Sequence, residues 1–142
     1  GDLRARARAV LPAIVGAEDL RSQVALRRYV FDAELAGLYG RARAFAFLSE
    51  YEGFGHPPLE ALRAGVPSVL FDASVAREVC GDAALYVSVG DSSGITSALD
   101  GLLFDDTARA RVLNAGPAVL ARYSWTRAAA ETLAALETAA HA

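Results

Sequence analysis

Cysteine is almost missing from this sequence, since Cys80 is the only one among 142 residues. A single thiol excludes an internal disulfide and a metal centre built on clustered cysteines, and it is typical of a reducing compartment. Long apolar runs are missing too, because no stretch approaches the roughly 18 residues that a membrane-spanning helix needs. We therefore expect Cys80 to be a small buried apolar residue in a folded core.

An excess of positive charge is also lacking. The chain carries 14 basic and 17 acidic side chains, for a net charge of −3, which does not favour nucleic acid as a partner. Arg4, Arg6 and Arg8 are locally basic, but the apolar residues between them indicate a helix whose arginines face water. With 54% hydrophobic and 22% charged residues, the composition predicts a globular chain. Its length suits one domain with a core of its own.

Apolar periodicity predicts helices that alternate with short strands. The expected helices cover residues 3–17, 32–42, 57–65, 74–81, 92–104, 106–121 and 125–140, and the expected strands cover 24–30, 44–49, 68–72 and 84–89. The strands lack the polar–apolar alternation of a half-exposed sheet, as is typical of parallel strands buried on both faces. We therefore predict an α/β fold, a Rossmann-like three-layer domain with a short parallel sheet of about four strands. Such a sheet is truncated relative to a complete doubly wound one.

Residues 49–62, SEYEGFGHPPLEAL, are the strongest candidate for a binding site. The expected strand ends near Ser49 and the next helix starts near Pro57. The segment therefore lies at the carboxyl end of a parallel strand, where α/β folds bind ligands. Gly53 and Gly55 allow the main chain to approach a ligand closely. The start of the helix adds free N–H groups and partial positive charge, which suit an anion such as a phosphate.

Two glutamates in the same segment favour a ligand that is more than a phosphate. Glu52 precedes the glycines, and Glu60 lies in the first turn of the helix. An ionised carboxylate only accepts hydrogen bonds, so it suits hydroxyl groups and not phosphate oxygens. A nucleotide sugar would satisfy all of these groups, with its diphosphate on the glycine loop and its sugar and ribose on the glutamates. The simpler alternatives are an exposed loop acid for Glu52 and an acid that favours the helix start and pairs with Arg63 for Glu60.

Two further residues have roles that the sequence leaves open. His56 could donate to a phosphate or a sugar, or it could shape the turn. Asp72 ends the strand expected at 68–72 and so lies on the same edge of the sheet. It could line the pocket there, but we favour a role in capping the next turn.

The stretch from Glu52 to Ala61, EGFGHPPLEA, resembles the E-x7-E motif of retaining glycosyltransferases of family four. The resemblance runs from about Val24 to Leu136, and its flanks include AFAFLSEYEGFG, EALRAGVPSVLFD, EVCGDAALYV, LLFDD and YSW. It implies the C-terminal, nucleotide-sugar-binding domain of an enzyme with the two-domain GT-B fold. Such an enzyme transfers a hexosyl group from a nucleoside diphosphate to an acceptor hydroxyl.

The resemblance also implies roles for individual residues. Glu52 would be the catalytic glutamate beside the donor sugar, and Glu60 would bind the ribose hydroxyls. The residues expected to bind the donor are Gly53, Phe54, Gly55, His56, Leu59 and Glu60. Within this set, the main-chain amides around Phe54 would contact the sugar and diphosphate, and Leu59 would lie close to the phosphates. Residues near Tyr29 and Val30 would border the base.

The family typically needs no metal and no other cofactor, so we expect none here. The donor would be a UDP-, GDP- or ADP-sugar, and the sequence does not distinguish the base, the sugar or the acceptor.

Parts of the family pattern are missing from the chain. The family's C-terminal domain begins with further strands that carry an Arg and a Lys on the diphosphate, whereas only a helix precedes Val24 here. The N-terminal domain that binds the acceptor is missing as well. We therefore expect residues 1–142 to form one partial donor-binding domain, with C-terminal helices over 106–142. We expect this chain alone to be inactive, and to be located in the cytoplasm or at the inner face of the membrane.

Two alternatives to an enzyme stay open. The chain could be a nucleotide-binding module without catalysis. It could also be a structural fragment, because a sheet without its first strands exposes an unpaired edge that favours a homodimer.

Overall fold

The computed structural model describes residues 24, 25, 27 and 29–141 of the chain. The chain divides into two compact units, Gly1–Asp32 and Ala33–Ala142, and each is taken by itself. The helix expected over residues 3–17 lies outside the described residues. The helices and strands given below belong to the second unit, apart from Asp32 at the start of the first helix.

A parallel sheet forms the centre of this unit. β1 (Phe45–Phe47), β2 (Ser68–Phe71) and β3 (Ala84–Val87) lie side by side in the order β1-β2-β3. The register pairs Phe45 with Ser68 across β1 and β2. These strands confirm three of the four that the sequence predicts, and each is shorter than expected.

The strand expected over residues 24–30 is wrong. Where the structure describes that stretch, no residue belongs to a strand. Tyr29 and the neighbouring Phe31 are 77% and 72% exposed, and their rings meet edge to face at 5.2 Å. β-branched and aromatic residues favour strands because they pack on the face of a sheet. Here these side chains are open to solvent instead.

Helices precede, connect and follow the strands. They are α3 (Asp32–Arg41), α4 (His56–Arg63), α5 (Ser74–Cys80), α6 (Ser92–Phe104), α7 (Asp106–Leu120) and α8 (Trp125–Ala140). Their bounds agree closely with the predicted ranges, in part because several helix starts are set by local caps. Asp91, Asp105 and Ser124 each accept a main-chain N–H from the helix that follows, which satisfies a donor that the helix itself leaves free.

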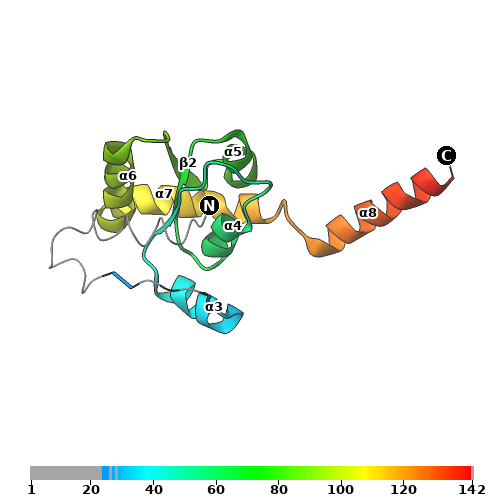
Figure 1. The fold of residues 1–142 in the computed structure, drawn as a ribbon, viewed down its shortest axis with the longest axis horizontal. Helices are drawn as coiled ribbons and strands as arrows, with labels where there is room; N and C mark the ends of the chain where they lie inside the picture. The colour runs from blue at the N-terminus through cyan, green and yellow to red at the C-terminus, as the bar shows by residue number, and fades with distance from the viewer. Residues whose placement is uncertain (1–23, 26, 28, 142) are drawn as a thin grey trace, which may run out of the picture. The chain divides into compact units, whose positions relative to one another are not determined.

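Helices cover both faces of the sheet, which confirms the three-layer α/β arrangement. Successive side chains of a strand point to opposite faces. On β2, Leu70 belongs to a buried cluster with Leu62 of α4 and Val79 of α5. The neighbouring Val69 belongs to a different cluster with Leu102 of α6. Figure 1 shows β2 between α6 on one side and α4 and α5 on the other.

α3 packs against α4 through a third cluster. Tyr39 is buried together with Ala61 and Val66, and its ring meets the edge of Phe45 on β1 at 5.5 Å between centroids. This packing brings the Tyr39 hydroxyl to the first turn of α4.

α7 approaches α4 closely at one glycine. A β-carbon on Gly116 would lie 3.0 Å from Cδ1 of Leu62. The absence of a side chain on Gly116 therefore allows this contact between the two helices.

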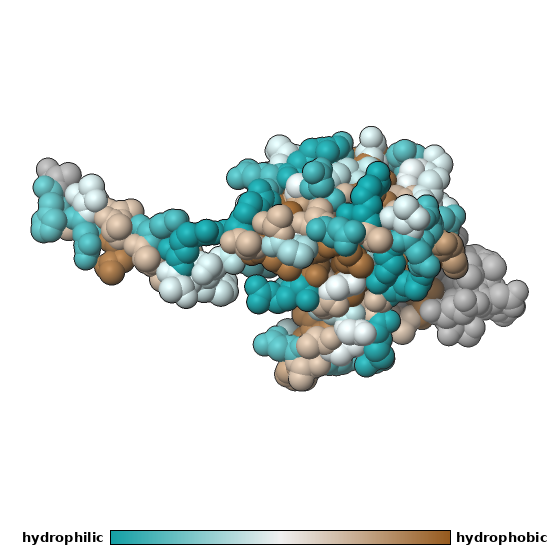
Figure 2. Space-filling model, turned by 180° about the vertical axis from the view of Figure 1, so that it is seen from behind, coloured by the Kyte–Doolittle hydropathy of each residue, from teal (hydrophilic) through white to brown (hydrophobic). Residues whose placement is uncertain are grey.

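The last helix, α8, buries none of its residues. Trp125, Leu133 and Leu136, which the sequence places on one helical face, are 83%, 57% and 64% exposed. Figure 2 shows hydrophobic patches along α8 among hydrophilic residues.

Candidate functional site

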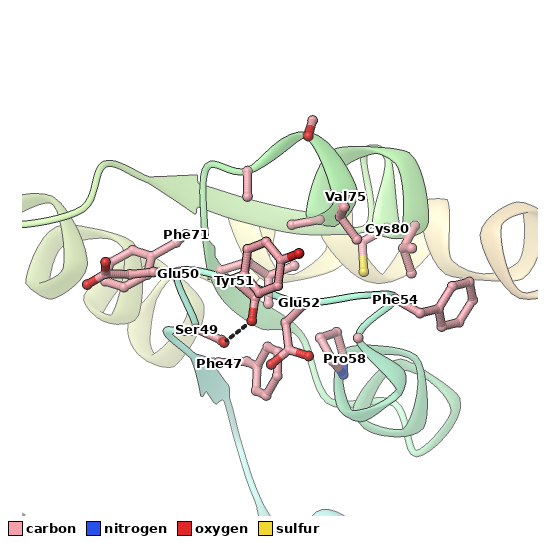
Figure 3. A pocket seen from close by; sticks show the side chains of 16 residues that line it. Phe47, Ser49, Glu50, Tyr51, Glu52, Phe54, Pro58, Phe71, Val75 and Cys80 are labelled. Atoms are coloured by element: carbon pink, nitrogen blue, oxygen red, sulfur yellow. Dashed lines mark hydrogen bonds between the residues drawn. The ribbon is translucent and has the colours of Figure 1, made fainter. Parts of the chain in front are cut away.

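A cavity of about 160 Å³ opens at the carboxyl ends of β1 and β2. One wall comes from the chain that follows β1, between Ser49 and Gly55, and the other from the chain that follows β2, between Ala73 and Ala76. Figure 3 shows the two segments on either side of the cavity. This is the edge of the sheet at which parallel α/β folds bind ligands, and it includes the segment that the sequence singles out.

The cavity has an apolar part and a polar part. Phe47, Pro58, Leu70, Val75, Val79 and Cys80 form the apolar part, and Ser49, Glu50, Tyr51, Glu52 and Ser74 form the polar part. Cys80 is only 2% exposed, and its burial raises the pKa of the thiol to about 11. Because the thiolate is the reactive form of cysteine, Cys80 acts as a small apolar residue, as predicted.

A hydrogen bond within the loop fixes the chain just before the glycines. The Ser49 hydroxyl donates to the carbonyl of Tyr51 at 3.2 Å (Figure 3). Glu50 and Glu52 point in different directions in the same view, and Tyr51 between them is 92% exposed. The turn therefore presents two carboxylates to different parts of the cavity.

The loop from Gly53 to His56 leaves its main-chain donors unpaired. Gly55 precedes α4 with φ 87° and ψ 65°, a left-handed conformation that glycine adopts readily. No side chain caps the start of α4. None of the N–H groups of residues 53–56 donates to an acceptor among the described residues.

Two prolines reduce the number of main-chain N–H donors at the start of α4. Pro57 and Pro58 occupy the first turn of α4, and proline has no N–H. The anion-binding capacity that a helix start usually has therefore rests here on the loop from Gly53 to His56 more than on the helix itself.

Glu60 lies outside the cavity, at the fifth of the eight positions of α4. Its Oε2 accepts a hydrogen bond from the Tyr39 hydroxyl at 3.4 Å, and the same hydroxyl lies 3.3 Å from the carbonyl of Pro57. Burial, and then the charge of Glu60, raise the pKa of Tyr39 to about 12. Tyr39 is therefore a neutral donor that orients an exposed carboxylate.

The ion pair considered for Glu60 is not formed. Among the residues that the structure describes, Arg63 makes no salt bridge with Glu60. The other simple alternative, an acid that favours the helix start, is not supported either. α4 begins at His56 and its first turn contains no acidic residue, so Glu60 lies beyond the first turn in which the sequence places it.

The structure places the residues expected at the site in two groups. Glu52, Phe54 and Gly55 line the cavity, whereas Gly53, His56, Leu59 and Glu60 do not. Leu59 is 9% exposed and belongs to the core cluster with Leu70, so only its main chain remains for a ligand. In the sequence, the glycine loop follows Glu52, which lines the cavity, and precedes Glu60, which does not.

Several residues at the site carry no signal in the sequence analysis. Glu50, Tyr51 and Ser74 line the cavity, and Tyr39 positions Glu60. Tyr39 lies in the helix expected over residues 32–42, and the apolar periodicity that predicts this helix gives its hydroxyl no role. A signal was available, because a buried tyrosine hydroxyl usually has a hydrogen-bond partner, although the partner could not be named.

Asp72 does not form the cap that we favoured. The N-cap residue of α5 is Ala73, which has no side-chain hydrogen bond. Asp72 instead forms a bidentate ion pair with Arg77, with Nε–Oδ1 at 2.5 Å and Nη2–Oδ2 at 2.7 Å. The hydrogen bond from Arg77 holds the pKa of the Asp72 carboxyl below its usual value. The Arg77 guanidinium also lies 4.3 Å from the centre of the Tyr86 ring. The Asp72 carboxylate therefore already has a charged partner within the protein.

Within residues 24–141 as far as they are described, no group of three or more His, Cys, Asp or Glu side chains could hold a metal ion. Over the same residues, no helix has both the length and the apolar character needed to span a membrane.

A family comparison gives the class of protein to which this fold and site belong. The model of the family described as "Glycosyl transferases group 1" matches residues 8–119. The chain therefore belongs to this glycosyltransferase family.

Individual relatives agree with the family. The chain is 38% identical to the O-antigen chain mannosyltransferase B of Escherichia coli over 105 residues, which are 74% of this chain and 28% of that protein. It is 35% identical to the MMP alpha-(1->4)-mannosyltransferase of Mycolicibacterium hassiacum over 113 residues, or 76% of this chain and 27% of that protein.

A third relative is the phosphatidyl-myo-inositol mannosyltransferase of Mycobacterium leprae. It is 36% identical over 91 residues, which cover 63% of this chain and 24% of that protein. The matched part of the chain thus spans about a quarter of the length of each of these relatives.

Proposed function

We propose that the described unit is the donor-binding part of a retaining glycosyltransferase of the GT-B type. The donor would be a nucleoside diphosphate sugar, and the group transferred to an acceptor hydroxyl would be a hexosyl group. Family membership supports glycosyl transfer. The assignment of a donor site within the chain rests on the geometry around the glycine loop.

One observation carries the proposal. The unpaired N–H groups of residues 53–56 lie between two carboxylates, one at the cavity and one on α4, at the carboxyl ends of parallel strands. A bare phosphate would be repelled by the carboxylates, and a bare sugar would bring no negative charge to the row of N–H groups. A ligand with a sugar, a diphosphate and a ribose in sequence matches this order of groups.

The loop would act on the leaving group. When the bond between the sugar and the diphosphate breaks, negative charge develops on the phosphate oxygens. The N–H groups of Gly53, Phe54 and Gly55 would donate to that charge from positions that the fold already holds, so little reorganisation accompanies the reaction.

Glu52 would act on the sugar. Its side chain lines the cavity together with Glu50 and Ser74, and these groups offer acceptors and a hydroxyl to a polyol. A carboxylate there would orient the sugar and stabilise the positive charge that grows on its anomeric carbon. In this proposal Glu52 is the catalytic residue.

Glu60 would bind the ribose hydroxyls. The Tyr39 hydroxyl uses one oxygen of the carboxylate and leaves Oε1 without a described partner. Because Glu60 is exposed and does not line the cavity, it would receive the nucleoside end of the donor while Glu52 receives the sugar end.

The names of the relatives indicate which hexose is transferred. The three similar proteins described above are all named mannosyltransferases, so we propose mannose as the hexose transferred. The acceptor would be bound by a second domain, as in the GT-B architecture. The proposal requires no metal ion or other cofactor.

Calorimetry with a panel of nucleoside diphosphates and their mannose derivatives tests the proposal. UDP, GDP and ADP would be titrated into the purified protein, into Glu60→Ala and into Glu137→Ala, an exposed carboxylate on α8 that serves as the matched control. Loss of the ribose hydrogen bonds removes about 1–3 kcal/mol, or about fivefold to a hundredfold in Kd. Binding that is equal in wild type and Glu60→Ala contradicts the role of Glu60, and no binding of any member contradicts the donor site.

A further inference from the structure

Residues 121–124, which join α7 to α8, and Trp125 at the start of α8 lie against the glycine loop through a row of aromatic rings. The edge of the Tyr123 ring meets Phe54 at 5.4 Å between centroids, with an interplanar angle of 88°. Phe54 lies 4.8 Å from the His56 ring. His56 stacks on Trp125 at 6.2 Å, with the two planes only 8° apart.

The same segment is attached firmly to α5. Nη2 of Arg122 donates to the carbonyls of Glu78 and Val79 at 2.9 and 2.8 Å. The Tyr123 hydroxyl donates to the Val79 carbonyl at 3.2 Å. These carbonyls belong to the last turn of α5, where helix carbonyls lack partners within the helix. Tyr123 is therefore held in place by α5, and its ring in turn contacts Phe54 of the glycine loop.

The loop needs such support. No side chain caps the start of α4, and the N–H groups of residues 53–56 have no described acceptor. Phe54 and His56 are the two side chains of this loop between the glycines and the prolines. Figure 3 shows the Phe54 ring turned away from Glu50 and Tyr51, two of the polar residues that line the cavity.

We infer that Tyr123 and Trp125 are positioning residues for the donor loop. By holding the rings of Phe54 and His56, they fix the direction of the N–H groups between Gly53 and His56. Both residues lie beyond residue 119, where the match to the family model ends, and belong to the YSW stretch that is among the flanks of the resemblance. The role in binding rests on the proposed function, whereas the role in holding the loop does not.

The side chains allow matched variants. Trp125→Ala removes the stack on His56, and Trp125→Phe keeps an aromatic ring at the same place. Trp125 is 83% exposed and is the first residue of a helix without buried residues, so neither change should unfold the protein. Thermal unfolding of each variant verifies this.

The loop itself can be followed without any ligand. The chain contains two histidines, His56 and His141, so the imidazole signals can be assigned in a proton NMR spectrum with a His141→Asn variant. Ring currents from Trp125 and Phe54 should displace the His56 signals. Removal of the Trp125 ring current moves the His56 signals by itself, so these signals report only the stack. The loop is followed through nitrogen relaxation of the amides of residues 53–55, whose order parameters should fall in Trp125→Ala and stay close to the wild-type values in Trp125→Phe.

Binding is then measured by calorimetry with the nucleoside diphosphate that wild type binds most tightly. An aromatic contact of this kind corresponds to about twofold to tenfold in Kd, so we expect a loss of that size in Trp125→Ala and a smaller loss in Trp125→Phe. Amide order parameters of residues 53–55 that are the same in wild type and Trp125→Ala overturn the inference, whatever the protein binds. A loop that moves while the Kd stays unchanged also overturns it. If wild type binds no nucleoside diphosphate, the proposed function fails, and the NMR comparison alone decides whether the rings hold the loop.

Discussion

The hydroxyl of Tyr39 on α3 lies 3.4 Å from Oε2 of Glu60 on α4. The two residues are 21 positions apart in the sequence and meet because α3 packs on α4. The contact gives one of the two glutamates of the candidate site a fixed orientation, and it links that site to the core.

Replacement of Tyr39 by phenylalanine should weaken donor binding more than it weakens the fold. The ring keeps its place against Phe45 and Ala61, so the free energy of unfolding should fall by only about 0.5–1.5 kcal/mol for the lost hydrogen bonds. Glu60 would lose its orienting donor, and the Kd for a nucleoside diphosphate should rise by about threefold to tenfold. Calorimetry and urea unfolding measure the two effects. An unchanged Kd would indicate that Glu60 needs no partner.

The same tyrosine predicts a loss of stability in alkaline solution. Its pKa is raised to about 12 from the ordinary tyrosine value of 10.0, so the folded state holds the phenolic proton more tightly than the unfolded state. The resulting stability is fully present below pH 10 and is lost as the pH rises toward 12. Urea unfolding between pH 9 and 11.5 should show a decline that is smaller in Tyr39→Phe. The decline should persist in part, because burial also raises the pKa of Tyr86.

The two loop glycines should respond differently to alanine. Gly55 has a φ of 87°, which is unfavourable for any side chain, whereas Gly53 has an ordinary φ and open space where a β-carbon would lie. Gly55→Ala should therefore lower the free energy of unfolding by about 1 kcal/mol or more.

Gly53→Ala should leave stability nearly unchanged and weaken donor binding, because its methyl group would occupy space that a ligand needs. Thermal unfolding and calorimetry on both variants test this pair. A Gly53→Ala protein with wild-type affinity would mean that the donor does not approach the main chain at this residue.

The contact between α4 and α7 predicts that the effect of Gly116→Ala on stability changes sign when Leu62 is replaced. Alanine in place of a glycine within a helix normally stabilises it by about 1 kcal/mol. At Gly116 the new β-carbon would lie 3.0 Å from Leu62 Cδ1, so the substitution should destabilise wild type by about 1 kcal/mol. In a Leu62→Ala background the crowding is absent, and Gly116→Ala should stabilise. Urea unfolding of the four proteins gives the coupling, and equal effects in both backgrounds would contradict the close approach.

Local signals explain which parts of the fold could be predicted from the sequence. The helices at Ser92–Phe104 and Trp125–Ala140 have the predicted bounds, and each begins after a capping side chain three residues from its N–H partner. The stretch over 24–30 has the composition of a strand, but none of its described residues belongs to one, because a strand requires a neighbour with which to pair. Composition does not supply that information.

The candidate site, too, could be predicted from the sequence in some respects and not in others. The glycine loop and its two glutamates stand together in the sequence, so their proximity could be predicted. Which glutamate lines the cavity could not, because that depends on where the segment after β2 lies. The partner of Asp72 could not be predicted either, since the choice between a cap and Arg77 depends on side-chain positions in three dimensions.

The central claim is that Glu60 binds the ribose of a nucleoside diphosphate, and a comparison of sugars tests it most directly. The nucleoside diphosphate that binds best would be titrated into wild type and Glu60→Ala alongside its 2′-deoxy and 3′-deoxy forms. We predict that wild type prefers the ribose form over at least one deoxy form by about fivefold or more, and that Glu60→Ala binds all three alike. A preference for ribose of the same size in both proteins would contradict the account.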